Sequence, residues 1–142
     1  MEESTMKLNF PVDRGEFASA GKASSRIKKI LQNIGLNNAF VRKVAIATYE
    51  AEMNLVIHSL GGQITISIGE GKVIIEVEDR GPGIENIELA MTEGYSTATE
   101  VIREMGFGAG MGLPNIKKCS DDLSIQSKVG EGTKMIMSFN YQ

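Results

Sequence analysis

Two polar side chains one helical turn apart are the first candidates for chemistry in this sequence. In Glu50-Ala51-Glu52-Met53-Asn54, the i, i+4 spacing puts Glu50 and Asn54 on the same face of a helix. A carboxylate in such a place can accept a proton from an attacking oxygen, and the amide oxygen of Asn can ligate Mg²⁺ without adding charge. The alternative is a pair of polar residues on an exposed helix face, because this spacing alone is not specific.

A second candidate is the segment Asp79-Arg80-Gly81-Pro82-Gly83, which directly follows a stretch with the pattern of a buried strand. An Asp at the end of a strand is well placed to accept a hydrogen bond from the exocyclic amine of adenine. Gly81 and Gly83 would let the backbone approach a purine ring closely. Taken alone, however, the segment is simply a turn.

The third candidate is a glycine run in which Gly106, Gly108, Gly110 and Gly112 alternate with other residues. Glycine at every second position removes side chains from one side of a loop, and a helix is expected to follow. Exposed amides together with a helix N-terminus suit a polyphosphate. A flexible linker is the alternative.

Two familiar phosphate motifs do not account for these glycines. A dinucleotide-binding GxGxxG fails because Met111 or Leu113 stands where the third glycine belongs. A Walker A motif fails at residues 15–22, because too many residues separate its glycines and Ala23 replaces Ser or Thr. A nucleotide would therefore be bound by another architecture.

Length and composition narrow the class of protein. The 142 residues, 42% of them hydrophobic, fit a single domain spanning residues 1–142. The net charge of -3 argues against nucleic acid or an anionic membrane as partner. One cysteine and one histidine leave neither an internal disulfide nor a structural zinc site to expect. With no signal-peptide pattern and no run approaching about 18 apolar residues, we expect a cytoplasmic protein.

Hydrophobic periodicity predicts the elements that must position these residues. We expect an α+β fold, a two-layer sandwich in which a mixed, mostly antiparallel sheet carries helices on one face. Asn37 or Asn38 is expected to cap the long helix that carries Glu50, and Gly35 to end the helix before it. The expected strands are 7–12, 64–68, 73–77, 123–129 and 134–139, and the expected helices are 16–34, 37–57, 87–91 and 112–119.

Together, and in this order, these segments resemble the gyrase–histidine-kinase–MutL superfamily (GHKL). Its ExxxN, DxGxG and GxGxG boxes match Glu50–Asn54, Asp79–Gly83 and Gly108–Gly112, and Gly130-Glu131-Gly132-Thr133 is like its GxT segment, whose Thr supports the adenine-binding Asp. Glu93–Thr97 and Gly108–Pro114 look like the stressosome switch kinase and the anti-sigma factor serine kinases. The resemblance implies a Bergerat-type fold that binds ATP and Mg²⁺.

The same resemblance implies a role for each matched residue. Glu50 would be the catalytic base, Asn54 the Mg²⁺ ligand and Asp79 the reader of adenine. Residues 93–107 would form a lid over ATP. This lid departs from the switch kinases in having residues 98–107 between Thr97 and Gly108, which weakens any transfer of partner identity. The further ATP-binding residues implied are Gly81, Gly83, Thr97, Gly108, Gly110, Gly112, Leu113 and Thr133.

Two functions stay open on the sequence. The first is a protein-serine kinase and anti-sigma regulatory factor that transfers the γ-phosphate of ATP to a serine of a small STAS-type antagonist. The second is a nucleotide-gated module that sequesters a sigma factor or other regulator without significant kinase activity. A purely structural adaptor is disfavoured because Glu50, Asn54 and Asp79 are all intact. A homodimer is left open.

Overall fold

A computed structural model describes residues 6–13, 15, 20–58, 61–81 and 112–141. In chain order these form β1 (Met6–Val12), α1 (Lys22–Asn33), α2 (Asn38–His58), β2 (Gly62–Gly69), β3 (Lys72–Asp79), α5 (Gly112–Cys119), β4 (Asp122–Lys128) and β5 (Gly132–Asn140). The helix expected at 87–91, the ATP lid expected at 93–107 and the glycine run up to residue 111 lie outside the described residues.

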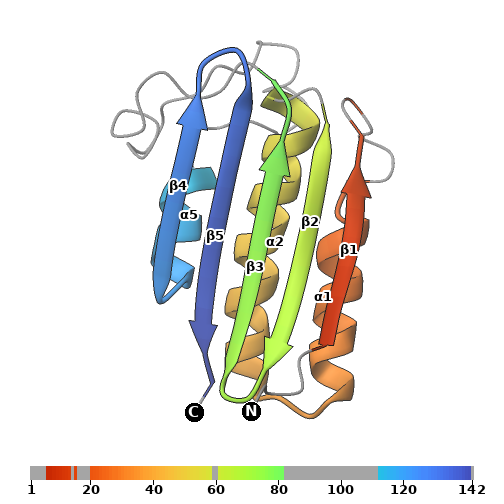
Figure 1. Cartoon of the computed structure of the whole chain (residues 1–142). Coiled ribbons are helices and arrows are strands. Elements are labelled where there is room, and N and C mark those ends of the chain that lie inside the picture. The colour runs from red at the N-terminus through yellow and green to blue at the C-terminus, as the bar shows by residue number, and fades with distance from the viewer. Residues whose placement is uncertain (1–5, 14, 16–19, 59–60, 82–111, 142) are drawn as a thin grey trace.

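The described strands form one five-stranded sheet in the order β1-β2-β3-β5-β4. Its four pairings are all antiparallel, so the mixed character that we allowed for is not found in the described part of the chain. The described helices lie on one face of the sheet, with α2 between α1 and α5 (Figure 1). The predicted two-layer α+β architecture is confirmed.

Alternation of apolar residues explains the central hairpin of this sheet. Ile64, Ile66 and Ile68 of β2 and Val73, Ile75 and Val77 of β3 all point to the helical layer and are buried. The register pairs Ile66 with Ile75, so both apolar sets reach the same face. The predicted stripe of α2 covers that face, because Val44, Ala47, Ala51 and Leu55 are each at most 1% exposed. The hairpin and the stripe are both confirmed.

The first helix begins later than the sequence predicted. We expected it from residue 16, yet Ala20 and Gly21 lie in a turn and α1 starts at Lys22. Gly21 has a φ of 95°, a left-handed conformation that a helix cannot continue through and that glycine adopts at little cost. At the other end, α1 stops at Asn33, just before Gly35, as expected.

The second helix, α2, starts where one of the two predicted caps places it. The side-chain Oδ1 of Asn37 accepts the N–H of Ala39 at 2.8 Å, so Asn37 rather than Asn38 is the cap. The helix extends to His58, one residue beyond the expected end. Among the residues described, no helix is both long and apolar enough to cross a membrane.

Candidate functional site

Three of the sequence boxes meet at one end of the sheet. There β3 ends at Asp79, β5 begins at Gly132, and α2 ends behind the sheet at the same end as the start of α5 (Figure 1). Asp79 and Thr133 are far apart in sequence, and the antiparallel register brings them together because β3 and β5 are neighbours. This end of the sheet is the candidate site.

Asp79 is held in place by the strand next to it. It is half-buried at the end of β3, and its Oδ1 accepts the backbone N–H of Thr133 at 2.9 Å. Burial raises the pKa of the Asp79 carboxyl above its ordinary value, and the hydrogen bond from Thr133 acts in the opposite direction. The carboxylate is therefore fixed through one oxygen, and among the described residues the other oxygen, Oδ2, has no hydrogen-bond partner.

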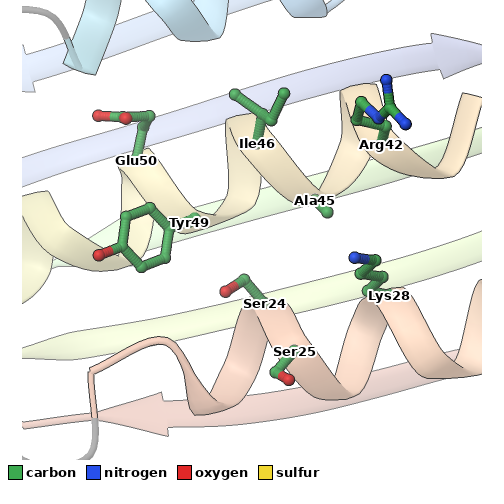
Figure 2. A pocket seen from close by; sticks show the side chains of 8 residues that line it. All are labelled: Ser24, Ser25, Lys28, Arg42, Ala45, Ile46, Tyr49 and Glu50. Atoms are coloured by element: carbon green, nitrogen blue, oxygen red, sulfur yellow. The ribbon is translucent and has the colours of Figure 1, made fainter. Parts of the chain in front are cut away.

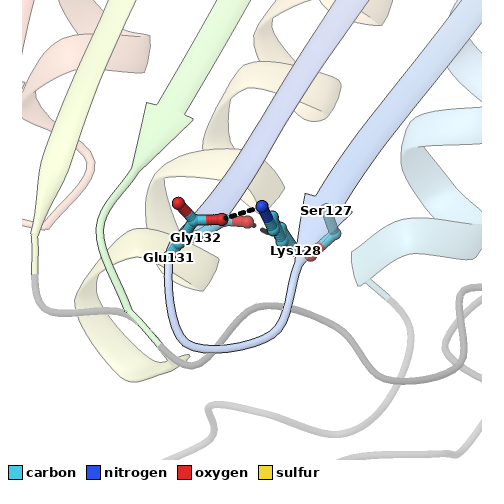
Figure 3. A network of polar contacts seen from close by, with 4 residues as sticks. All are labelled: Ser127, Lys128, Glu131 and Gly132. Carbon is cyan, nitrogen blue, oxygen red and sulfur yellow. Dashed lines mark hydrogen bonds and ion pairs between the residues drawn. The ribbon is translucent and has the colours of Figure 1, made fainter.

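The backbone N–H of Thr133 bonds to Asp79, while its hydroxyl contacts Ser127. The Oγ1 of Thr133 lies 2.8 Å from the Oγ of Ser127 on β4. Ser127 Oγ also reaches the carbonyl oxygen of Gly132 at 3.3 Å, which ties the start of β5 to the end of β4 (Figure 3). The same turn carries an exposed ion pair of 3.0 Å between Lys128 and Glu131. Sequence reasoning missed Ser127, and no motif marks it.

Gly132 allows the close approach between β5 and Asp79. A Cβ built on it would lie 2.2 Å from the backbone carbonyl oxygen of Asp79 and 3.1 Å from its side-chain Oδ1. Its φ of +133° is also one that other residues rarely adopt. Any side chain at this position would push the Asp79 carboxylate away from Thr133. The glycine of the predicted GxT segment therefore has a steric role in positioning the Asp.

Glu50 lies on α2 beside the helix α5. It is half-buried on α2, and the side chain of Asn115 on α5 donates a hydrogen bond to its carboxylate. Burial raises the pKa of Glu50 above the ordinary value of 4.5, and the hydrogen bond from Asn115 opposes this rise. Asn54, one turn along α2, is also half-buried. The predicted pair thus lies on α2 with Glu50 bonded to the helix that follows the glycine run.

Asn115 was not singled out from the sequence, although a signal was present. It is the polar residue in the first turn of α5, between the buried Leu113 and the buried Ile116. A polar residue among apolar ones, shortly after a glycine run, is the signal that could have found it. Leu113 itself is 9% exposed, and its side chain packs in the core, where it holds α5 against the other buried residues.

The second carboxylate of the ExxxN box has a structural role. Glu52 is 3% exposed, and its Oε2 accepts the N–H groups of Gly21 at 3.0 Å and Ala23 at 3.1 Å. Its Oε1 accepts the N–H of Ser24 at 3.0 Å. These are the unpaired donors at the start of α1, so Glu52 of α2 caps a helix that lies far from it in sequence. Glu52 is therefore not available as a base, which leaves Glu50.

Of the remaining residues predicted to bind ATP, some are described by the structure and others are not. Gly81 is described and lies buried two residues after Asp79, and Gly112 begins α5. Gly83, Thr97, Gly108 and Gly110 lie outside the described residues. Their assignment to an ATP site stays a prediction.

Comparison with known proteins identifies the family to which this site belongs. The profile of the histidine kinase-, DNA gyrase B- and HSP90-like ATPases matches residues 24–142. The chain belongs to this ATPase family. Membership implies a nucleotide site for ATP, and it confirms the resemblance drawn from the sequence boxes.

Two relatives in this family are named as an anti-sigma factor and as a serine/threonine-protein kinase. The chain is 38% identical over 146 residues to an anti-sigma F factor of Clostridium acetobutylicum, a match covering 96% of this chain and 94% of that protein. It is 30% identical over 112 residues to the serine/threonine-protein kinase RsbT of Bacillus subtilis, covering 76% and 78% of the two chains.

One solved structure shows the same fold. It is the crystal structure of the RsbU and RsbW domains of a Mycobacterium tuberculosis protein, with a TM-score of 0.64 and 18% identity. The match covers 95% of this chain and 32% of that chain, so the present chain spans about a third of the solved one.

Proposed function

We propose that this protein is a protein-serine kinase of the anti-sigma type, which uses Mg²⁺ and ATP to phosphorylate a serine of a small STAS-type partner. The observation that supports this best is the half-buried Glu50, bonded to Asn115 at the start of the helix after the glycine run. A carboxylate with a raised pKa, beside a phosphate-binding segment, suits a general base. The names of the relatives, an anti-sigma F factor and a serine/threonine-protein kinase, support the same reading.

Asp79 would select adenine. Its Oδ1 is engaged by Thr133, so its Oδ2 would accept the exocyclic amine of the base. The close passage of Gly132 against Asp79 fixes the direction of the carboxylate, which favours one base over another. A guanine would present a carbonyl oxygen there, and two acceptors would then face each other.

Asn54 and the start of α5 would hold the phosphate end. The Asn54 amide oxygen is a hard, neutral ligand of the kind that Mg²⁺ takes together with phosphate oxygens. Gly112 begins α5, so the N–H groups of that first turn are available for an anion. Bound Mg²⁺ would neutralise charge on the phosphates. The protein's own residues would then orient the acceptor serine and take its proton at Glu50.

A second function is favoured by the names of several relatives. Several are anti-sigma F factors, and the one from Clostridium acetobutylicum matches nearly the whole chain. The protein could therefore sequester a sigma factor when nucleotide is bound, with phosphorylation secondary or absent. A homodimer is compatible with either function.

One experiment separates the two functions. The protein is incubated with radiolabelled ATP and each candidate STAS protein encoded in its own genome, and Glu50→Gln serves as the matched control. Label on a serine of one STAS protein, lost in the control, supports the kinase. Tight ATP-dependent binding of a partner without any transfer of label would replace the kinase by the binding module.

A further inference from the structure

Two large apolar side chains lie exposed next to each other on the outer side of α2. Ile46 is 41% exposed and Tyr49 is 39% exposed, although both belong to a helix whose opposite side is fully buried. They form part of the lining of a groove between α1 and α2 with a volume of about 380 Å³ (Figure 2). Exposed apolar surface in a defined groove is typical of a binding site.

One end of the groove carries positively charged side chains, and the other end includes Glu50. Lys28 of α1 and Arg42 of α2 lie at one end, and Ser24, Tyr49 and Glu50 lie at the other (Figure 2). Among the residues that the structure describes, neither Lys28 nor Arg42 has an ion-pair partner, since the described pairs join other residues. The groove therefore offers a place for a carboxylate at one end, and Glu50 lies at the rim of the other end with its side chain directed away from α1 (Figure 2).

We propose that this groove binds the segment of the protein substrate that carries the accepted serine. The segment would lie extended, with its serine at Glu50, an apolar side chain on Ile46 and Tyr49, and an acidic side chain against Lys28 and Arg42. The positive charge of Lys28 and Arg42 and the position of Glu50 at the rim of the groove favour this occupant. The proposal rests on the proposed kinase function for the identity of the segment.

The length of the groove predicts the spacing within the substrate. Arg42 and Glu50 are two turns apart on α2, which at about 1.5 Å per residue gives about 12 Å. An extended chain advances about 3.3 Å per residue, so the acidic residue lies about four positions from the serine. The apolar residue falls between them. This spacing is specific enough to test with peptides.

The test uses a fluorescently labelled library of short serine peptides in which the neighbouring positions are varied. Binding to the intact protein is measured by anisotropy, for the wild type, for the double variant Lys28→Glu/Arg42→Glu, and for Lys29→Glu as a control. Lys29 is exposed on α1 but does not line the groove. The wild type should select an acidic residue about four positions from the serine. The double variant should lose about tenfold in affinity while Lys29→Glu binds normally.

Reversing the peptide charge gives a second, independent readout. Peptides with Lys in the acidic position should bind the double variant better than the wild type, which a general loss of folding cannot produce. The proposal is overturned if no peptide binds, if the library selects no acidic residue, or if the double variant binds as the wild type does. It is also overturned if light scattering shows that the double variant changes the oligomeric state, because the groove is then an interface between copies.

Phosphoryl transfer to the same peptides separates this proposal from the kinase function. If peptides bind through Lys28 and Arg42 but no serine is labelled from radiolabelled ATP, the docking site stands and the kinase function is lost. If serines are labelled equally by the wild type and the double variant, the kinase stands and the docking site is wrong.

Discussion

Replacing Glu52 by Gln should destabilise the fold far more than the same change at Glu50, two residues away on α2. The Glu52 carboxylate is almost fully buried and accepts the N–H groups of Gly21, Ala23 and Ser24. A Gln can turn its one carbonyl oxygen toward Gly21 and Ala23, but its NH₂ group then faces the N–H of Ser24. One charge-assisted hydrogen bond becomes a contact between two donors.

The magnitude follows from these three bonds. A hydrogen bond to a charged group contributes about 1.5–3 kcal/mol, and an unpaired buried donor costs about 1–3 kcal/mol. Loss of the negative charge at the start of α1 adds about 0.3–1 kcal/mol. Since such terms are not additive, we expect a total loss of about 2–4 kcal/mol in the free energy of unfolding. For a domain of this size, Tm should fall by roughly 6–12 °C.

The assay is urea and thermal unfolding followed by far-ultraviolet circular dichroism, with Glu50→Gln as the matched control. Burial raises the pKa of Glu50, so its contribution to stability is present below the unfolded pKa and lost as the pH rises through the folded pKa. At neutral pH the control should therefore lose little or no stability. If Glu52→Gln stays within about 0.5 kcal/mol of the wild type, the change behaves as a surface substitution and Glu52 does not cap α1.

Four further predictions concern the candidate site. Asn54→Ala should weaken binding of Mg²⁺-ATP in calorimetry, and an unchanged affinity would remove Asn54 from the site. GTP should bind about 10- to 100-fold more weakly than ATP, because a buried acceptor at Asp79 is left unpaired; comparable affinities would exclude that role. Glu50→Gln should bind ATP nearly normally yet lose about 10²- to 10⁴-fold in transfer rate. The rate in wild type should rise with pH through a pKa above 4.5, the ordinary Glu value, and an acidic limb at or below that value would contradict the burial of Glu50. Gly132→Ala should weaken ATP binding and lower Tm, because its Cβ would meet the Asp79 carbonyl at 2.2 Å; wild-type values for both would show that the strands move apart without penalty.

Patterns of short range in the sequence were enough to predict most of the described elements. The β2–β3 hairpin follows from alternation over adjacent residues, and the stripe on α2 follows from a period near 3.6. The placement of Glu50 and Asn54 on one helix needed only their spacing. These features depend on neighbours in the chain, so one sequence contains the information.

Features that depend on residues distant in the chain could not be predicted from local patterns. The start of α1 is fixed by Glu52, which bonds to donors 28 to 31 residues away. The bond from Asn115 to Glu50 requires that α5 lies against α2, which no local pattern indicates. The resemblance indicated that Thr133 supports Asp79, and the structure shows that the backbone N–H of Thr133 does so. In each case the partner is set by packing rather than by local spacing.

The pairing of β3 with β5 has a consequence for the order in which the protein folds. The β2–β3 and β4–β5 hairpins each close over short loops, so both can form early. The bond between Asp79 and Thr133 joins residues 54 apart, so it waits until the two hairpins meet. On the proposed function, the adenine side of the site would therefore be completed by a late step of folding. A chain that has formed only its hairpins would then lack the proposed nucleotide site, and ATP would bind only to chains in which the whole sheet is joined.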